Sequence, residues 1–84
     1  MSAKVTIRYF AAARAAAGFD DEIIGIAPGT TLAALVRGLA DRDPALAKVL
    51  SRCSYLCDGI AMRDLAMTLS DAQTIDVLPP FAGG

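Results

Sequence analysis

The stretch K-V-T-I-R-Y-F, residues 4–10, alternates side chains with the two-residue period of a β-strand. Its β-branched and aromatic residues also favour a strand. We expect the odd-numbered face, with Val5, Ile7 and Tyr9, to be the core side. Phe10 then falls on the opposite face, at the end of the strand. An aromatic residue is therefore predicted on the face that the core does not use.

Shorter stretches downstream have the same character. Residues 22–26 are predicted to form a second strand, antiparallel to the first, and Phe19 just before it is expected to fold back onto the core. Asp58-Gly59 is a strong signal for a two-residue hairpin turn. This turn would join a strand over residues 53–57 to a short one over residues 60–62. Residues 73–78 read as the last strand.

One main helix is predicted between the second and third strands. Leu32, Leu35, Val36 and Leu39 recur at the i, i+3, i+4 and i+7 spacing of a helical face. Thr30 or Thr31 would cap this helix, because a threonine oxygen can accept a free N–H of the first turn. Two other segments have weaker signals. Residues 11–17, rich in alanine, are predicted to form a short helical turn or a wide loop closed by glycine, and residues 45–50 one more helical turn.

The order strand, strand, helix, strand, short strand, strand predicts an α+β protein of the β-grasp type. We expect a mixed sheet of about five strands, with one main helix packed on one face. Residues 1–78 would form the domain and residues 79–84 an extended, flexible C-terminal tail. In this arrangement the first and last strands are central neighbours. With one helix, the other face of the sheet stays open to solvent or to a partner. Leu65 and Leu69 are expected to anchor the loop before the last strand.

The chain closes with Pro79-Pro80-Phe81-Ala82-Gly83-Gly84. The two prolines offer no N–H to a sheet and favour a stiff, extended exit. Gly83 and Gly84 lack a Cβ, so this end fits a passage too narrow for other residues. Its reactive group would be the α-carboxylate of Gly84. The alternative is an ordinary solvated tail, as chain ends often are.

Apolar residues are predicted to gather at the root of this tail. Leu78 lies on the non-core face of the last strand, as Phe10 does on the first. If the two strands are parallel neighbours, these side chains lie close together, and Ile60 at the hairpin could extend the patch. A cluster of this kind, where a tail emerges, favours a docking surface. Scattered exposed apolar residues are the alternative.

Composition excludes several classes of function. The net charge is −1 and no segment carries a basic stripe, so nucleic-acid binding is not expected. No apolar run approaches the roughly 20 residues of a membrane span, and no signal-like segment opens the sequence, so a cytoplasmic protein is expected. The chain has no histidine, which removes the usual general base and metal ligand. Cys53 and Cys57 are expected to be small apolar fillers in a reducing compartment, and no metal site is predicted.

Two stretches resemble the small, sulfur-carrying subunits of molybdopterin synthase. The opening V-T-I-R-Y-F-A-A-A-R, residues 5–14, with a glycine at 18, is similar to that family's opening. The closing V-L-P-P-F-A-G-G, residues 77–84, is similar to its most diagnostic stretch. The chain departs from the family at Cys57-Asp58, where Val-Asn is frequent, and at residues 71–73, where Asp-Gly-Asp is frequent. Alanine in place of that glycine, at Ala72, puts the geometry of the last turn in doubt.

The resemblance implies a carrier that has no catalytic activity alone and serves as the sulfur-donating subunit of a heterotetrameric sulfurtransferase. A separate E1-like adenylating enzyme would activate the Gly84 carboxylate with ATP, and a sulfur donor protein would convert it to a thiocarboxylate. The tail, with Phe81, Ala82 and Gly83, would then enter the large catalytic subunit of molybdopterin synthase and deliver sulfur to a pterin precursor. Phe10, Ile60 and Leu78 match the family's partner-binding surface. The carrier itself would bind no cofactor.

Three alternatives remain open from the sequence. The chain could carry sulfur for thiamine or cysteine synthesis, with the same tail chemistry and a different acceptor. It could be a ubiquitin-like modifier whose Gly84 ends in an isopeptide bond to a lysine. It could also be a plain interaction module.

Overall fold

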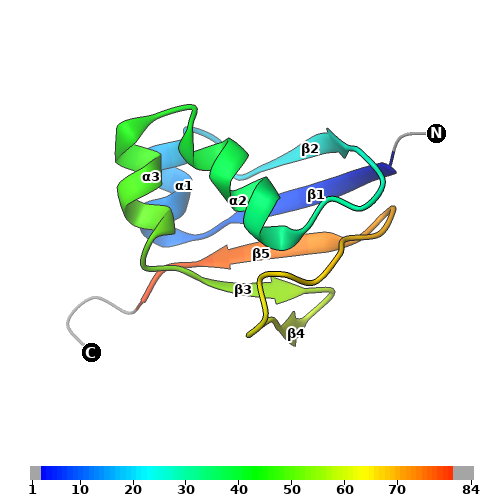
Figure 1. Ribbon diagram of the computed structural model, residues 1–84. Helices are drawn as coiled ribbons and strands as arrows, with labels where there is room; N and C mark the ends of the chain where they lie inside the picture. The colour runs from blue at the N-terminus through cyan, green and yellow to red at the C-terminus, as the bar shows by residue number, and fades with distance from the viewer. Residues whose placement is uncertain (1–2, 81–84) are drawn as a thin grey trace.

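The computed structural model of the protein describes residues 3–80. Its helices and strands follow one another as β1 (Ala3–Tyr9), α1 (Ala11–Ala17), β2 (Asp21–Ile26), α2 (Leu32–Ala40), α3 (Pro44–Leu50), β3 (Ser54–Cys57), β4 (Ile60–Ala61) and β5 (Thr74–Leu78). Figure 1 shows the three helices on one side of a single sheet. No helix within residues 3–80 is long and apolar enough to cross a membrane.

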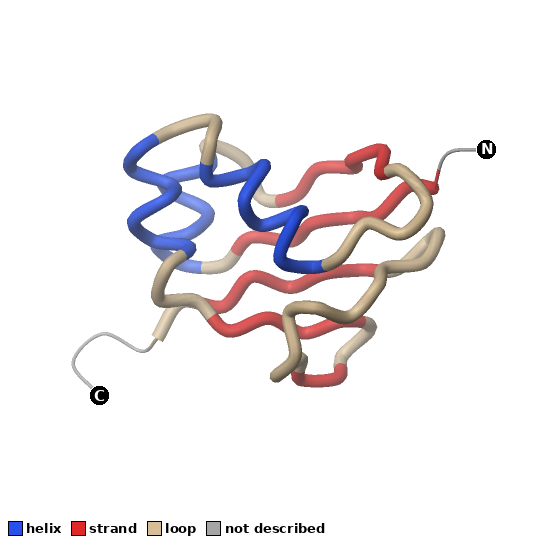
Figure 2. Tube along the Cα trace, viewed as in Figure 1, coloured by secondary structure: helices blue, strands red, loops and turns tan. Residues whose placement is uncertain are grey.

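The sheet has five strands in the order β2-β1-β5-β3-β4 (Figure 2). β1 and β5 are parallel neighbours at its centre, with Thr6 opposite Thr74 and Tyr9 opposite Val77. The other pairs are antiparallel. This is the predicted β-grasp arrangement, in which the first and last strands are neighbours although they are far apart in the sequence. Because β1 and β5 are parallel, their C-terminal ends lie side by side.

The core lies between the sheet and the helices. Val5, Ile7 and Tyr9 are buried, as the alternation along β1 predicts. From the helical side, α2 contributes Leu32, Leu35 and Leu39, and its first turn is capped by Thr31, whose side chain accepts a hydrogen bond from the backbone N–H of Ala34. The predicted amphipathic helix and one of its two candidate caps are confirmed. The remaining buried apolar residues are Ala13, Ile26, Leu46, Leu50, Tyr55, Cys57, Leu69, Ile75 and Val77.

The helical layer holds more than the one main helix that we expected. α1 and α3 are regular helices of seven residues each, and each packs a buried side onto its neighbours. Alanine gives α1 no large apolar stripe, but it allows close approach, and Ala13 is fully buried. Gly18 ends α1 in the left-handed conformation (φ 91°) that glycine tolerates. Close packing of small side chains thus stabilises a helix that periodicity alone does not reveal.

Two large side chains are not where the sequence predicts them. Phe19 is 44% exposed, and its ring makes an edge-on contact with the buried ring of Tyr9, at 6.0 Å between centroids. Leu69 is buried as expected, whereas Leu65 is 38% exposed. The backbone carbonyl of Leu65 accepts a hydrogen bond from Ala33 N, so the loop is held here by its main chain.

The predicted turns and strand boundaries are close to those observed. Asp58-Gly59 forms the hairpin turn between β3 and β4 with positive φ at both residues (51° and 83°). β1 ends one residue earlier than predicted because Phe10 is the N-cap of α1. Ala72 has a φ of 68°, the strained conformation that its place in the last turn suggested. Each difference concerns how the chain turns at the end of an element.

Candidate docking site at the end of the central strands

An apolar groove lies where β1 and β5 end. Its volume is about 570 Å³, and it brings Phe10 and Leu78 together, as the parallel pairing of the two strands requires. Pro79 and Pro80 also line it, so the chain leaves the domain along the groove itself. The remaining lining residues are Ala11, Ala12 and Ser54. The predicted apolar cluster at the root of the C-terminal segment is thus present as a groove.

The local backbone explains why this groove is open. The N–H of Phe10 donates to the carbonyl of Val77 at 3.3 Å, which ties the end of β1 to β5. Ala11 then takes a positive φ of 50° and turns the chain sharply into α1. The neighbouring side chains, Ala12 just after the turn and Ser54 at the start of β3 opposite Leu78, are too small to fill the space beside Phe10. An aromatic ring and a leucine are therefore left lining a groove that the protein does not fill.

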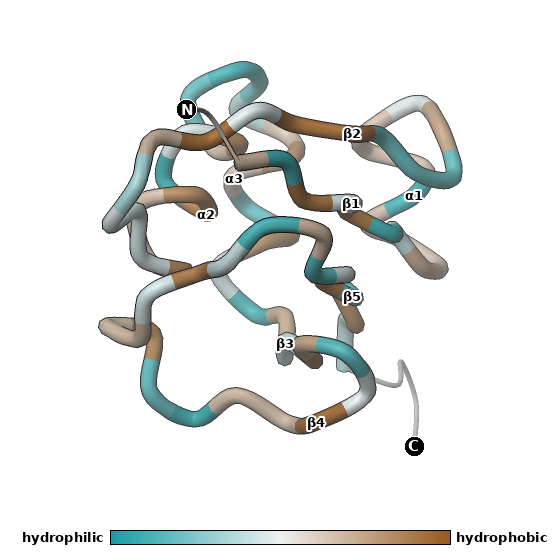
Figure 3. The backbone as a smooth tube through the Cα atoms, turned by 90° about the vertical axis from the view of Figure 1, so that its right-hand side faces the viewer, coloured by the Kyte–Doolittle hydropathy of each residue, from teal (hydrophilic) through white to brown (hydrophobic). Residues whose placement is uncertain are grey.

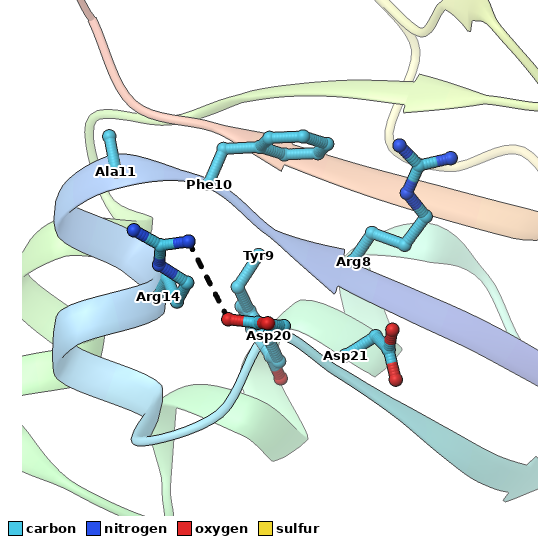
Figure 4. Close-up of a pocket in the computed structure, with 7 residues that line it drawn as sticks. All are labelled: Arg8, Tyr9, Phe10, Ala11, Arg14, Asp20 and Asp21. Carbon is cyan, nitrogen blue, oxygen red and sulfur yellow. Dashed lines mark ion pairs between the residues drawn. The ribbon is translucent and has the colours of Figure 1, made fainter.

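A second hollow, of about 270 Å³, lies on the other side of Phe10 and is charged (Figure 4). The Arg14 guanidinium lies 3.6 Å from a carboxylate oxygen of Asp20, a loose ion pair between two largely exposed side chains. The Arg8 guanidinium carbon lies 5.3 Å from the centre of the Phe10 ring, within cation–π range. The two hollows share Phe10 and Ala11. The apolar groove is thus bordered by two arginines.

Arg8 also pairs with its neighbour on β5. Its Nε lies 3.3 Å from Oδ1 of Asp76, the residue directly opposite it in the parallel pair. That oxygen is buried and forms no hydrogen bond of good geometry. The contact is therefore an ion pair without the alignment of a strong hydrogen bond. Half of the Arg8 side chain is exposed, so its guanidinium remains accessible from solvent.

Ile60 does not belong to this groove. It lies on the edge strand β4 opposite Cys57, and directly opposed residues share a face of the sheet. Since Cys57 points into the core, Ile60 points to the helical side of the sheet, where it is 65% exposed because no helix covers it. Leu78 points to the open side. The structure therefore separates Ile60 from the Phe10–Leu78 pair with which the sequence analysis grouped it.

The two cysteines form no disulfide; Cys53 is partly buried and Cys57 is buried. The Cys53 thiol donates a hydrogen bond to the carbonyl of Val49 at 3.2 Å, and burial raises the pKa of this thiol. Burial, and then the charge of Asp58, raises the pKa of Cys57. Both thiols are thus held in the less nucleophilic, protonated form. Within residues 3–80, no three Cys, Asp or Glu side chains gather closely enough to hold a metal ion.

The predicted reactive residues of the tail, Phe81, Ala82, Gly83 and Gly84, lie outside the described residues. The charged half of the site, with Arg8, Arg14, Asp20 and Asp21, was missed by the sequence analysis, which assigned these residues no role. One signal was available. Arg8 and Phe10 are two apart on one strand, so they share a face, and Arg14 follows one helical turn after the strand ends.

The topology and the groove define the class of protein as a small β-grasp domain with a docking surface beside its C-terminal segment. The sequence pattern of the ThiS family matches residues 7–84, and the chain belongs to that family. None of the curated proteins compared with the chain matches it in sequence.

Solved structures agree with the family. The putative molybdopterin converting factor subunit 1 from Pyrococcus furiosus superposes with a TM-score of 0.85 at 24% identity, over 95% of this chain and 100% of that one. Small archaeal modifier protein 1 from Methanosarcina acetivorans gives 0.82 at 27% identity, over 100% and 99%. A chain in the complex of subunits 1 and 2 of the molybdopterin-converting factor from Helicobacter pylori gives 0.67 at 25% identity, over 96% and 99%.

Proposed function

We propose that the protein is a sulfur carrier for molybdopterin synthesis. One observation carries the proposal: the apolar groove formed by Phe10 and Leu78 opens where the chain passes through Pro79 and Pro80 into a Gly-Gly ending. A surface at this position can hold a partner while the narrow ending reaches into that partner's active site. The family match, which extends to residue 84, supports the same reading.

The chemistry would take place on the Gly84 carboxylate. A carboxylate is a poor acyl donor because it has no good leaving group, so a separate enzyme would first join it to the AMP part of ATP, releasing pyrophosphate. A sulfide equivalent from a donor protein would then attack the acyl carbon and AMP would leave. The product is a thiocarboxylate. The chain supplies no histidine for acid–base catalysis, so the partners would provide it.

The partner that receives the sulfur would be the large subunit of molybdopterin synthase. The support is the Helicobacter pylori complex, in which a chain 25% identical to this one is part of an assembly of subunits 1 and 2. The groove would bind an apolar side chain of the large subunit beside Phe10. Arg8 and Arg14 at its border would favour acidic residues there, because their ion pairs with Asp76 and Asp20 are long, at 3.3 and 3.6 Å, and more than half of each side chain is exposed.

Intact mass measures the first step directly. The protein is incubated with the adenylating enzyme, ATP and a sulfur source, and the expected change is the replacement of one oxygen by one sulfur. A chain that lacks Gly84 should fold equally well and show no change. The proposal fails if the full chain gains no sulfur while the same enzyme loads another carrier, or if the shortened chain retains sulfur transfer.

The acceptor is tested separately. The loaded carrier is mixed with a large subunit of molybdopterin synthase and with the corresponding acceptor of thiamine synthesis. We expect binding and loss of the thiocarboxylate only with the synthase subunit. Delivery only to the thiamine acceptor would keep the sulfur chemistry and reassign the pathway.

A ubiquitin-like modifier is the second candidate, and a specific observation favours it. Small archaeal modifier protein 1 from Methanosarcina acetivorans is 27% identical over the whole of this chain. In that case Gly84 would end in an isopeptide bond to a lysine of another protein. Mass spectrometry of cellular proteins would find lysines that carry the end of this chain, and removing Gly84 would abolish them.

A further inference from the structure

β2 is an edge strand whose outer side has no partner in the described part of the chain. It pairs with β1 on one side and comes first in the sheet order. Beyond that ladder, the backbone groups of Asp21–Ile26 form no hydrogen bonds within residues 3–80. In Figure 3, β2 runs along the upper margin of the molecule and contains a strongly hydrophobic stretch. An open row of N–H and C=O groups of this kind is a template for an added strand.

An apolar hollow accompanies this edge on the helical side of the sheet. It measures about 250 Å³ and lies between Ile24 of β2 and the face of α2 that carries Ala34, Leu35, Gly38 and Leu39. Gly38 leaves the wall without a side chain. The hollow is smaller than the roughly 300–1,000 Å³ of a typical small-molecule site. Its size and lining suit aliphatic side chains that alternate along an extended peptide.

The far end of the hollow is fixed by an ion pair. Arg42 forms a bidentate contact with Glu22, with its Nη1 at 2.9 and 2.8 Å from the two carboxylate oxygens, and Glu22 also accepts a hydrogen bond from the Tyr9 hydroxyl at 2.7 Å. Arg42 is thereby neutralised within the protein. The hollow therefore attracts an apolar group, and an acidic peptide gains nothing from this arginine.

The opposite face of the same strand carries one large apolar side chain, Ile23, which is uncovered. Ile23 is 70% exposed, the largest exposed fraction among the large apolar side chains of residues 3–80. Natural edge strands are commonly protected by lysine, proline or a bulge, and β2 has neither lysine nor proline. An added strand would place alternate side chains over Ile23 and into the hollow.

Charge at the start of β2 indicates what flanks such a peptide. Asp20 and Asp21 are both exposed there, and the side-chain ion pair of Asp20 with Arg14 is loose at 3.6 Å. Such exposed pairs contribute little and exchange readily. Two exposed carboxylates at this end of the strand, one of them in only a loose ion pair, favour a peptide with basic residues at that end.

We propose that the β2 edge binds an extended aliphatic peptide segment, flanked by lysine or arginine at the end beside Asp20 and Asp21, by strand addition. The segment would belong to a partner protein. The hollow beside Ile24 shares no residue with the apolar groove at the end of β5, whereas Asp20 and Asp21 also line the charged hollow beside Phe10. Peptide binding along β2 does not require sulfur transfer.

The probes are two synthetic peptides, Lys-Lys-Val-Ile-Val-Ile for a parallel strand and Val-Ile-Val-Ile-Lys-Lys for an antiparallel one. Each is titrated into ¹⁵N-labelled protein. We expect saturable chemical-shift changes in β2 and on the inner face of α2 with at least one of them, and about tenfold weaker binding when glutamates replace the lysines. No saturable binding of either peptide, or shifts centred on Phe10 and Leu78, would overturn the proposal.

Two variants test the surface itself. A Cβ built at Gly38 meets no atom within 4 Å, so Gly38→Leu should fill the hollow without disturbing the fold. We expect it to weaken the better peptide about tenfold or more. Ile23→Thr should also weaken binding, whereas Ile60→Thr on the opposite edge strand, at a similar exposure, should not. Equal effects of the two isoleucine variants would contradict a site at β2.

A second copy of the chain is the competing occupant. Sedimentation of the free protein with and without Gly38→Leu distinguishes it. We expect a monomer in both cases. A dimer that Gly38→Leu dissociates would assign the edge to self-association and overturn the peptide proposal.

Discussion

Ala72 is strained by the connection that it makes. Its φ of 68° lies in the left-handed region, which disfavours a Cβ. Its N–H donates to the carbonyl of Lys4 at 2.7 Å, while the N–H of Lys4 donates to the carboxylate of Asp71 at 2.8 Å. These two bonds fasten the loop before β5 to the start of β1. Ala72 therefore helps to set the register of β1 and β5, although its Cβ disfavours the positive φ that this position requires.

Replacing Ala72 with glycine should relieve this strain. We expect Ala72→Gly to increase the free energy of unfolding by about 1 kcal/mol, because glycine adopts positive φ without steric cost. Urea denaturation measures the change. Ala72→Val, which is β-branched, should lower stability in the same experiment. If Ala72→Gly lowers the free energy of unfolding, Ala72 is not strained in the folded protein.

The two tyrosines predict how stability depends on alkaline pH. Burial, with a smaller contribution from the charge of Cys53, raises the pKa of Tyr55 to about 12. Burial, followed by the hydrogen bond to Glu22, raises the pKa of Tyr9 further. In the unfolded chain both would titrate near about pH 10. The folded state holds these protons more tightly, so their contribution to stability is complete below about pH 10 and is lost as pH rises above it.

The chain contains no other tyrosine and no tryptophan, which makes this prediction easy to follow. Tyrosinate absorbance should stay low until the protein unfolds, and should then rise for both residues together. The urea midpoint should fall between about pH 10 and pH 12. A tyrosine that ionises in the folded protein near its ordinary pKa would contradict the burial of its hydroxyl. Tyr9→Phe should make the urea midpoint less sensitive to alkaline pH, and the remaining sensitivity should come from Tyr55.

At the scale of elements, α2 contributes three buried leucines to the core, Leu32, Leu35 and Leu39. Leu35 is buried against the sheet from its inner face. Leu35→Ala should cost roughly 2–5 kcal/mol, the range for truncating a buried leucine. Thermal or urea unfolding tests this, with exposed Arg37→Ala on the same helix as the matched control. An unchanged melting temperature for Leu35→Ala would exclude the predicted helical face.

Elements with a strong period could be predicted from the sequence, and elements built by close packing could not. Alternation placed β1 and its buried face correctly, and the leucine spacing placed α2. α1 has no apolar stripe, so its helical state depends on the fit of Ala13 against α3, which periodicity does not encode. The prediction for Phe19 was wrong for a related reason: Tyr9 is buried and Phe19 rests on it edge-on and half-exposed, and the sequence does not show which of the two rings is buried.

At the scale of the whole molecule, the docking groove should separate binding from folding. Leu78 is half-buried and lines the groove, so Leu78→Asp should weaken binding to the large synthase subunit more than it lowers the melting temperature. Calorimetric titration and thermal unfolding of one sample measure both. If melting collapses instead, Leu78 belongs to the core.

Ile60→Asp is the matched comparison. It changes an exposed aliphatic residue on the helical side of the sheet, away from the groove. If docking is confined to the groove, binding should be unaffected by this change. If binding weakens as much as with Leu78→Asp, the partner also covers the β4 edge, as the family resemblance implies.

The candidate site was predictable where it depends on strand order. Parallel pairing of β1 and β5 follows from the β-grasp order, and it brings Phe10 and Leu78 to one edge. The position of Ile60 depends on which face of a two-residue edge strand it takes, and so short a strand has no alternation to decide this. The charged hollow depends on how the α1 turn folds back toward Asp20, which is a matter of loop geometry.

The central place of β5 also bears on synthesis and quality control. β5 leaves the ribosome after the other four strands of this sheet, yet β1 and β3 meet only through it. A nascent or truncated chain without Thr74–Leu78 has two half-sheets with nothing to join them, so cooperative folding must wait until this strand is free. The groove forms in the same event, because Leu78 is one of its walls. A chain that can be recognised at its groove is therefore one that has already finished folding, and incomplete copies are kept from its partners without any separate inspection.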